Sequence, residues 1–236
     1  MKKQKMAINL KSTQAYAQSG VKILVYGQSG AGKTTLIKTA PQPIILSTEG
    51  GLLSLQDCDI PYIEIHTLDE LGEALNFLSQ SKEGLQFKTV ALDSISEIAE
   101  VVLSASKVGL KDGRAAYGEM NDVMTKVIRS FRDLPNRHVY FSAKLDKTLT
   151  DTGTMLYAPS MPGKTISQQL PYFFDEVLAL RIVTDKDNVV QRVLQCQSDP
   201  LWLAKDRSGR LEMWEPANIG AVIEKISSSS SGDDKE

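Results

Sequence analysis

Eight residues near the amino end, Gly27-Gln-Ser-Gly-Ala-Gly-Lys33-Thr34, have the spacing GxxxxGK followed by Ser or Thr. Glycines let the backbone curl so that successive N–H groups point inward at phosphate oxygens. In such a loop the lysine reaches the β- and γ-phosphates of a nucleoside triphosphate, and the threonine hydroxyl ligates Mg²⁺. A chance match is expected on the order of once per hundred chains of this length. The run therefore predicts a site for ATP and Mg²⁺.

The residues expected to contact the nucleotide are those of the loop and the position after it. They are Gly27, Gln28, Ser29, Gly30, Ala31, Gly32, Lys33, Thr34 and Thr35. The run lies between an apolar segment that predicts a strand and a segment that predicts a helix, which is the context that phosphate-binding loops require.

Asp93 is the candidate for a second Mg²⁺ ligand. It ends a predicted strand, Phe87–Leu92, and a carboxylate there could hold the metal opposite Thr34, often through water. The alternative is that Asp93 or Ser94 caps the helix that follows.

Glu49 lies just after another predicted strand, Ile44–Ser47. Catalytic groups collect at the carboxyl ends of parallel strands, and a carboxylate there could orient the water that attacks the γ-phosphate. The alternative is a solvated turn residue before two glycines. Lys33 and Glu49 are thus the first catalytic candidates.

Strands and amphipathic helices alternate along the first two thirds of the chain. The expected strands are Val21–Tyr26, Ile44–Ser47, Pro61–Ile65, Phe87–Leu92 and His138–Ser142. The expected helices begin at Gly32–Lys33, after a capping box at Thr67-Leu-Asp-Glu70, at about residue 94, and at Tyr117, the last running to Leu134. This alternation predicts a mostly parallel sheet covered on both faces. Two β-hairpins, over Lys147–Tyr157 and Val177–Gln197, and a short helix over 216–226 are expected to follow.

Composition is that of an ordinary globular protein. The chain has 236 residues, of which 42% are apolar and 24% charged, and a net charge of −2. We expect an N-terminal arm over 1–20, one ATPase domain over 21–226 and a disordered acidic tail over 227–236. The apolar runs are too short to cross a bilayer and no signal peptide is evident, so we expect a cytoplasmic protein without membrane contact. Two cysteines and two histidines make a disulfide scaffold or a zinc site improbable.

Several of these segments resemble the RecA-like ATPases. Glu49 in Ser-Thr-Glu-Gly-Gly-Leu looks like the catalytic glutamate that RecA carries after the strand following its P-loop. Thr89-Val-Ala-Leu-Asp93-Ser94 looks like the segment that ends in the metal-binding aspartate. The resemblance implies an α/β fold built on a RecA-like P-loop NTPase core, with a mostly parallel central sheet flanked by helices and with C-terminal β-hairpin additions.

The whole chain also resembles phage-encoded RecA-like proteins of the Sak type, which anneal single strands. The residues that carry this resemblance follow the P-loop domain: Pro162-Gly-Lys164, Phe174-Asp-Glu-Val177, Leu203-Ala-Lys-Asp-Arg-Ser-Gly209 and Glu215-Pro-Ala-Asn218. It implies ATP hydrolysis in recombination, single-stranded DNA as the partner and the bacterial host cytoplasm as the location. A single-strand binding protein is a further candidate partner.

Three basic residues are assigned roles through the resemblance. The strand that ends in a γ-phosphate-sensing glutamine in RecA ends here in Ser142-Ala-Lys144, and Lys144 could contact phosphate instead. Lys205-Asp-Arg207-Ser-Gly resembles a signature whose two cations reach the γ-phosphate of a neighbouring subunit, which would stabilise the transferred phosphoryl group. That role makes Lys205 and Arg207 catalytic candidates and implies a homo-oligomer, a ring or a filament with active sites between subunits. The alternative is a basic turn at Ser208-Gly209.

RecA proteins bind single-stranded DNA with two loops, which correspond here to about 105–118 and 144–166. Both stretches interleave cations with aromatic residues, and single strands need cations for phosphates and flat faces for bases. The candidate DNA-binding residues are Lys107, Lys111, Arg114, Lys144, Lys147 and Lys164. The alternative is a set of solvated loop lysines, and the net charge of −2 gives no global basic signal.

Other functions remain open on the same residues. A helicase-related or loader ATPase of DNA replication is supported equally by Lys205 and Arg207. A small-molecule kinase would be expected to carry an arginine-rich lid, and the arginines here are scattered. A nucleotide-binding scaffold without turnover is the fourth alternative.

Overall fold

The computed structural model describes residues 19–108, 113–150 and 153–228. Most of the predicted arm and of the acidic tail, 1–18 and 229–236, lies outside this range. One ten-stranded sheet organises the described residues, in the order β10-β8-β7-β1-β5-β4-β2-β3, with β6 paired to β5 and β9 to β7. The strands are β1 Lys22–Gly27, β2 Pro43–Ser47, β3 Tyr62–Glu64, β4 Thr89–Asp93, β5 His138–Leu149, β6 Met155–Ser160, β7 Glu176–Thr184, β8 Val190–Gln195, β9 Lys205–Asp206 and β10 Trp214–Pro216.

The central strands run parallel and the C-terminal strands antiparallel. β3, β2, β4, β5, β1 and β7 pair in parallel, whereas β6, β8, β9 and β10 pair antiparallel with their neighbours. The predicted α/β fold, with a mostly parallel sheet and added C-terminal hairpins, is confirmed.

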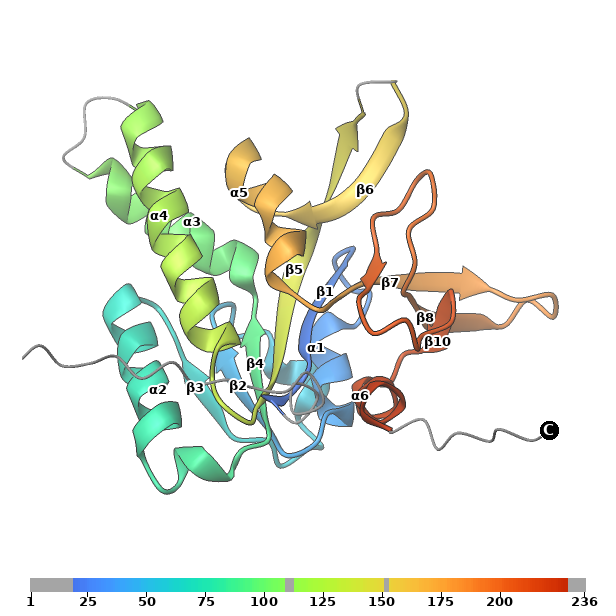
Figure 1. Ribbon diagram of the computed structural model, residues 1–236, viewed down its shortest axis with the longest axis horizontal. Coiled ribbons are helices and arrows are strands. Elements are labelled where there is room, and N and C mark those ends of the chain that lie inside the picture. Colours follow the sequence, from blue (N-terminus) through green and yellow to red (C-terminus); the bar gives the residue numbers. More distant parts are fainter. Residues whose placement is uncertain (1–18, 109–112, 151–152, 229–236) are drawn as a thin grey trace, which may run out of the picture.

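Helices cover both faces of the sheet (Figure 1). They are α1 Lys33–Leu36, α2 Leu68–Gln80, α3 Ile95–Lys107, α4 Gly113–Arg132, α5 Lys164–Gln169 and α6 Ile219–Ser227. In β1 the side chains of Leu24 and Tyr26 face α2 to α5, and those of Ile23 and Val25 face α1 and α6. This period of two is the pattern of a strand buried on both faces. Among the described residues no helix is long and apolar enough to span a bilayer.

Several boundaries differ from those predicted. β5 does not stop at Ser142 but continues to Leu149, because its outer half, from Lys144 on, pairs with β6. α4 begins at Gly113 rather than Tyr117, and α5 was not predicted. The first helix is short: α1 passes into a 3₁₀ turn, Ile37–Thr39, that ends before Pro41 as expected. The capping box at Thr67 and Glu70 is present.

The β5–β6 hairpin is anchored by aromatic and cationic side chains. The rings of Tyr157 and Trp202 stack with centroids 4.5 Å apart. The Arg181 guanidinium carbon lies 4.6 Å from the Trp202 centroid and 5.0 Å from that of Trp214, on β10. Cations over aromatic faces are attracted by the ring quadrupole. The stack therefore ties the hairpin to the C-terminal strands.

A group of charged residues, the amino-edge cluster, lies where β1 and β7 begin. It consists of Asp175, Glu176, Lys205, Asp206 and Arg207. Arg207 Nη1 pairs with Asp175 Oδ1 at 2.8 Å, and Lys205 Nζ donates to the carbonyls of Pro171 and Phe174 at 2.9 and 2.5 Å. Glu176 is fully buried, and its carboxyl lies beside those of Asp206 and Asp175. Burial, followed by the neighbouring carboxyls of Asp206 and Asp175, raises the pKa of Glu176 to about 8.

This shift predicts a pH dependence of stability. A glutamate ordinarily ionises near pH 4.5, so between about pH 4.5 and about pH 8 the folded chain holds a proton that the unfolded chain has lost. The free energy of unfolding should therefore fall as the pH rises through this window. Glu176→Gln removes the titrating proton, so the variant should gain stability over the wild type with rising pH. Urea unfolding across the pH range measures the difference, and a difference that does not vary with pH would contradict the assignment.

Candidate nucleotide-binding site

The predicted phosphate loop connects β1 to α1 at the centre of the sheet. Gly30 and Gly32 adopt φ angles of 76° and 102°, a region that glycine enters without steric cost. Gly27 is required for a different reason, because a Cβ there would lie 2.8 Å from the carbonyl oxygen of Leu180 on β7. The loop closes through a hydrogen bond from the Ala31 N–H to the Gln28 carbonyl at 3.2 Å. Local glycine chemistry thus produces the curled backbone expected from the motif.

A cleft of about 780 Å³ opens over this loop. Eight of the nine residues predicted to contact the nucleotide line it, and the ninth, Ala31, is buried behind the loop. The other lining residues are Glu49, Gly51, Ser54, Asp93, Ser94, Lys144, Leu145, Lys147 and Arg192. The cleft therefore joins the loop to both predicted carboxylates.

Lys33 lies within the loop, at the start of α1. Its Nζ donates to the carbonyls of Gly27 and Gln28 at 3.0 and 3.1 Å. Burial lowers the pKa of Lys33, and the nearby carboxylates of Asp93 and Glu49 oppose that effect. The buried Tyr140 hydroxyl donates to the Lys33 carbonyl at 2.8 Å, which fixes the backbone beneath the amine.

Asp93 faces Thr34 across the floor of the cleft. The Thr34 hydroxyl donates to Asp93 Oδ2 at 2.5 Å, and the Ser142 hydroxyl, from β5, donates to Asp93 Oδ1. The cap of α3 is Ser94, whose Oγ accepts from the Glu97 N–H, so Asp93 is not used as the cap. A hydroxyl and a carboxylate side by side are the hard oxygen donors that Mg²⁺ prefers. The donor set fits the predicted metal.

Glu49 lies on the other side of Asp93, beyond the end of β2. Ser94 Oγ donates to Glu49 Oε1 at 2.7 Å, so the carboxylate has a fixed partner while remaining exposed to the cleft. Thr48, the residue before it, donates from its N–H to the Asp93 carbonyl at 3.0 Å. The loop of Glu49 is thereby attached to the end of β4.

Lys144 also reaches the cleft, one strand away from the loop. Its Nζ pairs with Glu97 Oε2 at 2.6 Å, and this contact raises the pKa of Lys144. At this position Lys144 could contact a phosphate from the β5 side of the cleft. That Lys144 contacts phosphate in place of the RecA glutamine stays a prediction.

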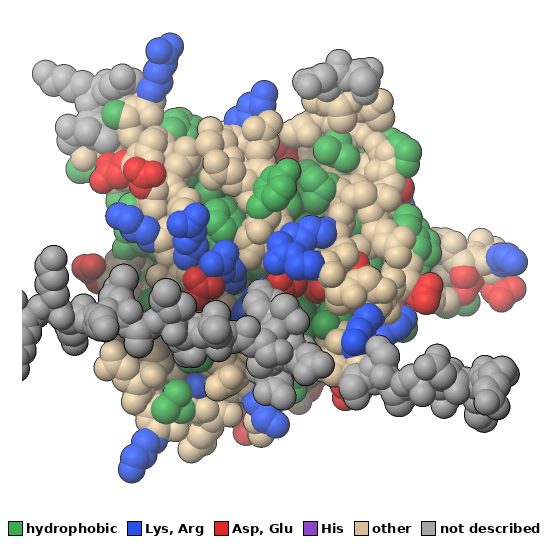
Figure 2. Space-filling view, viewed as in Figure 1, with side chains coloured by type: hydrophobic (Ala, Val, Ile, Leu, Met, Phe, Trp, Pro, Cys, Tyr) green, Lys and Arg blue, Asp and Glu red, His purple; other side chains and the backbone are tan. Residues whose placement is uncertain are grey.

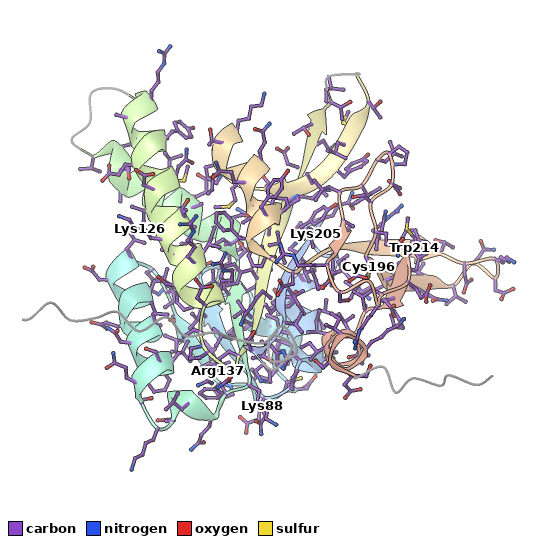
Figure 3. All side chains as sticks on the ribbon, in the orientation of Figure 1. Lys88, Lys126, Arg137, Cys196, Lys205 and Trp214 are labelled. Atoms are coloured by element: carbon purple, nitrogen blue, oxygen red, sulfur yellow. The ribbon has the colours of Figure 1, made fainter. Side chains whose placement is uncertain are left out.

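Lys205 and Arg207 lie in the amino-edge cluster, at the other end of the strands from the loop. β1 has six residues and separates the two sites by roughly 16–20 Å, so neither cation reaches the loop of its own chain. Lys205 points into the fold (Figure 3). The side chain of Arg207 is 52% exposed and borders a second cavity, of about 220 Å³, that Lys22 and Tyr172 also line. Action on a neighbouring subunit stays a prediction.

The candidate DNA-binding residues fall into separate groups. Lys107 Nζ lies 5.9 Å from the Tyr117 ring centroid, and Tyr117 packs against Gly163, the residue before Lys164. Lys147 Nζ lies 5.5 Å from the Tyr157 centroid. Arg114 is exposed on α4, Lys144 pairs with Glu97, and Lys111 lies outside the described residues.

Basic charge on the molecule is local. On the face in Figure 2, Lys and Arg side chains gather across the middle, with Asp and Glu side chains among them. The β5–β6 hairpin and the amino end of α4 both project at the top of Figure 1. DNA binding is a prediction that this placement does not test.

Two residues of the site were not predicted from the sequence. The Ser142 hydroxyl donates to Asp93, and Arg192 reaches the loop from β8. No local motif marks either of them. Lys147, predicted as a DNA-binding residue, also lines the cleft. For Arg192, the partner residue is 161 positions away, and only the pairing of β8 with β7 brings the two together.

Comparison with known proteins matches the chain to a family model and to solved structures. Residues 19–208 match a family model described as an AAA domain. Among solved structures, a KaiC-like protein from the hyperthermophilic archaeon Pyrococcus horikoshii is similar at 14% identity, over 75% of this chain and 77% of that chain, with a TM-score of 0.39. No curated protein matches the sequence.

The site separates binding from hydrolysis in a testable way. Lys33→Ala should abolish ATP turnover and strongly weaken nucleotide binding, because the β- and γ-phosphates lose their cation.

Glu49→Gln should keep binding but lower kcat by about a hundredfold or more, since an amide cannot accept a proton from water. Calorimetry with ATP and phosphate-release assays measure the two effects. Lys38→Ala, on the exposed turn after α1, is the control. Wild-type turnover in Lys33→Ala would overturn the site.

Proposed function

The chain belongs to the AAA domain family, and we propose that it is a Mg²⁺-dependent ATPase of the RecA-like type that acts on single-stranded DNA. The observation that carries the ATPase part is the convergence of Lys33, Thr34, Asp93 and Glu49 on one cleft. These four residues supply a phosphate cation, two metal ligands and a candidate base, which together are the parts that phosphoryl transfer to water requires.

Each residue has a defined task in this proposal. The backbone of the loop binds the phosphates and Lys33 supplies positive charge at their end. Thr34 and Asp93 hold Mg²⁺, which when bound neutralises charge on the phosphate oxygens. Glu49 accepts a hydrogen bond from the attacking water and takes its proton, while the Ser94 hydroxyl keeps the carboxylate pointing into the cleft.

Single-stranded DNA is the proposed partner because cations and aromatic rings occur in pairs near the same edge of the sheet. Lys107 with the exposed Tyr117 offers a charge for a phosphate and a flat face for a base. Lys147, over the Tyr157 ring that stacks on Trp202, adds a second charge. Lys147 also lines the ATP cleft, so a strand bound there would lie next to the nucleotide. Annealing or pairing of strands in phage recombination is the activity that the resemblance implies.

The alternative is a helicase-related or loader ATPase of DNA replication. It uses the same cleft and the same cations, so the site does not separate the two. A strand-displacement assay does, since an annealing protein should pair complementary strands without unwinding a duplex.

Stimulation by DNA tests the proposal. The ATPase rate should rise when single-stranded DNA is added at low salt, and this stimulation should decline steeply as salt increases, because binding releases counterions from the phosphates. A Lys107→Ala/Lys164→Ala double variant should need a higher DNA concentration for half-maximal stimulation. Lys88→Ala, at the amino edge of the sheet, is the matched control (Figure 3). Equal rates with and without single-stranded DNA would reject the DNA part and leave the ATPase standing.

Subunit mixing tests the proposed role of Arg207 in an oligomer. Arg207→Ala should lower turnover but spare nucleotide binding, because the cation would act on the neighbouring phosphate. Mixing it with Lys33→Ala subunits should restore part of the activity, since a hybrid interface then carries one intact loop and one intact arginine. Arg207→Ala also removes the ion pair with Asp175, so the melting temperatures of the variant and the wild type are compared to detect any loss of stability. Absence of rescue in stable mixtures would argue for a structural role.

A further inference from the structure

Arg192 approaches the phosphate loop from a part of the chain that carries no nucleotide motif. It lies in β8, directly opposite Ile182 of β7. Its Nε donates a hydrogen bond to the carbonyl of Ala31 at 2.9 Å. β7 itself approaches the loop closely, since the Leu180 carbonyl leaves no room for a Cβ at Gly27. The β7–β8 hairpin is therefore packed against one flank of the loop.

The charged end of Arg192 is exposed to the nucleotide cleft. The residue lines the cleft and is exposed, and Nε is the atom that contacts the loop. Both Nη nitrogens are without a hydrogen-bond or ion-pair partner among the described residues. Lys144, on the β5 side of the cleft, is paired with Glu97, whereas Arg192 has no carboxylate partner among the described residues. Its positive charge is thus available to an anion in the cleft.

We propose that Arg192 binds the nucleotide directly, at the phosphates that the Ala31–Gly32 backbone surrounds. The proposal rests on the assignment of the loop as a nucleoside triphosphate site. Backbone N–H groups of such a loop surround the α- and β-phosphates, whereas the loop lysine reaches the β- and γ-phosphates. A guanidinium fixed through Nε keeps its two Nη groups for bidentate contact with phosphate oxygens.

Gly32 makes room for this arrangement. A Cβ at that position would lie 3.1 Å from Arg192 Nε, and the residue has a φ of 102°. The glycine that the loop needs for its own curvature also lets the guanidinium lie against the backbone. Arg192 and Lys33 then contact the phosphate chain from two different elements, β8 and α1.

The α- and β-phosphates occur in both ADP and ATP, which gives the proposal a specific kinetic signature. An interaction made equally with substrate and product contributes uniform binding, so its loss raises KM without lowering kcat. Arg192→Ala should weaken ADP and ATP binding by the same factor, about tenfold or more, and leave kcat within about twofold of the wild type. AMP, which lacks the β-phosphate, should bind the variant and the wild type more nearly alike.

Calorimetry with AMP, ADP and a slowly hydrolysed ATP analogue tests this in wild type, Arg192→Ala, Arg192→Lys and Lys186→Ala. Lys186 is an exposed cation in the turn of the same hairpin and does not line the cleft, so its variant controls for general charge. Arg192→Lys keeps the charge but has one nitrogen, and it should recover part of the affinity. Melting temperatures without nucleotide test whether Arg192 only holds the loop in place.

The outcomes separate the two assignments. Equal ADP affinity in Arg192→Ala and the wild type would overturn the role of Arg192 while the loop still binds nucleotide. That role would also be overturned if Arg192→Ala lowered the melting temperature of the nucleotide-free protein enough to account for the weaker binding. Arg192 would then only hold the loop in place. Absence of nucleotide binding in the wild type would instead reject the proposed function, and the role of Arg192 with it.

Discussion

The hydrogen bond between the Thr34 hydroxyl and Asp93 connects two elements on which the whole cleft depends. It joins the phosphate loop, which follows β1, to the end of β4, although β5 lies between these strands in the sheet. Ser142 of β5 donates to the second carboxylate oxygen, so all three strands are connected at one side chain. A partly buried carboxylate is costly unless its oxygens are satisfied, and these hydroxyls satisfy them. Glu49 is positioned through the same strand end, by way of Thr48 and Ser94.

The C-terminal strands contribute more to this site than their position in the sequence implies. β7 fixes the requirement for glycine at position 27, and β8 brings Arg192 to the loop. β9 places Lys205 and Arg207 at the other end of the same strands. The sheet thus separates two kinds of polar chemistry. Its carboxyl edge carries the phosphate loop and carboxylates open to a cleft, and its amino edge carries ions that are mostly paired within the fold.

The sequence predicted those features that depend on neighbouring residues. The loop over 27–34, the strands of the parallel sheet and the capping box at Thr67 are all encoded within a few positions of one another, so spacing alone identifies them. Asp93 and Glu49 were identified because they follow strands. Ser142 and Arg192 were not, because their partners lie 49 and 161 positions away. The extension of β5 to Leu149 was missed for a similar reason, since it depends on pairing with β6 rather than on an apolar pattern.

The stack that anchors the β5–β6 hairpin has an optical consequence. Trp202 and Trp214 are the two tryptophans of the chain, and both contact the guanidinium of Arg181. Indole emission from this protein therefore originates at a single junction, where the hairpin meets the last strands of the sheet. A change in that emission reports a change in the packing of the hairpin against the C-terminal strands. It does not report on the distant half of the sheet, which contains β2 and β3.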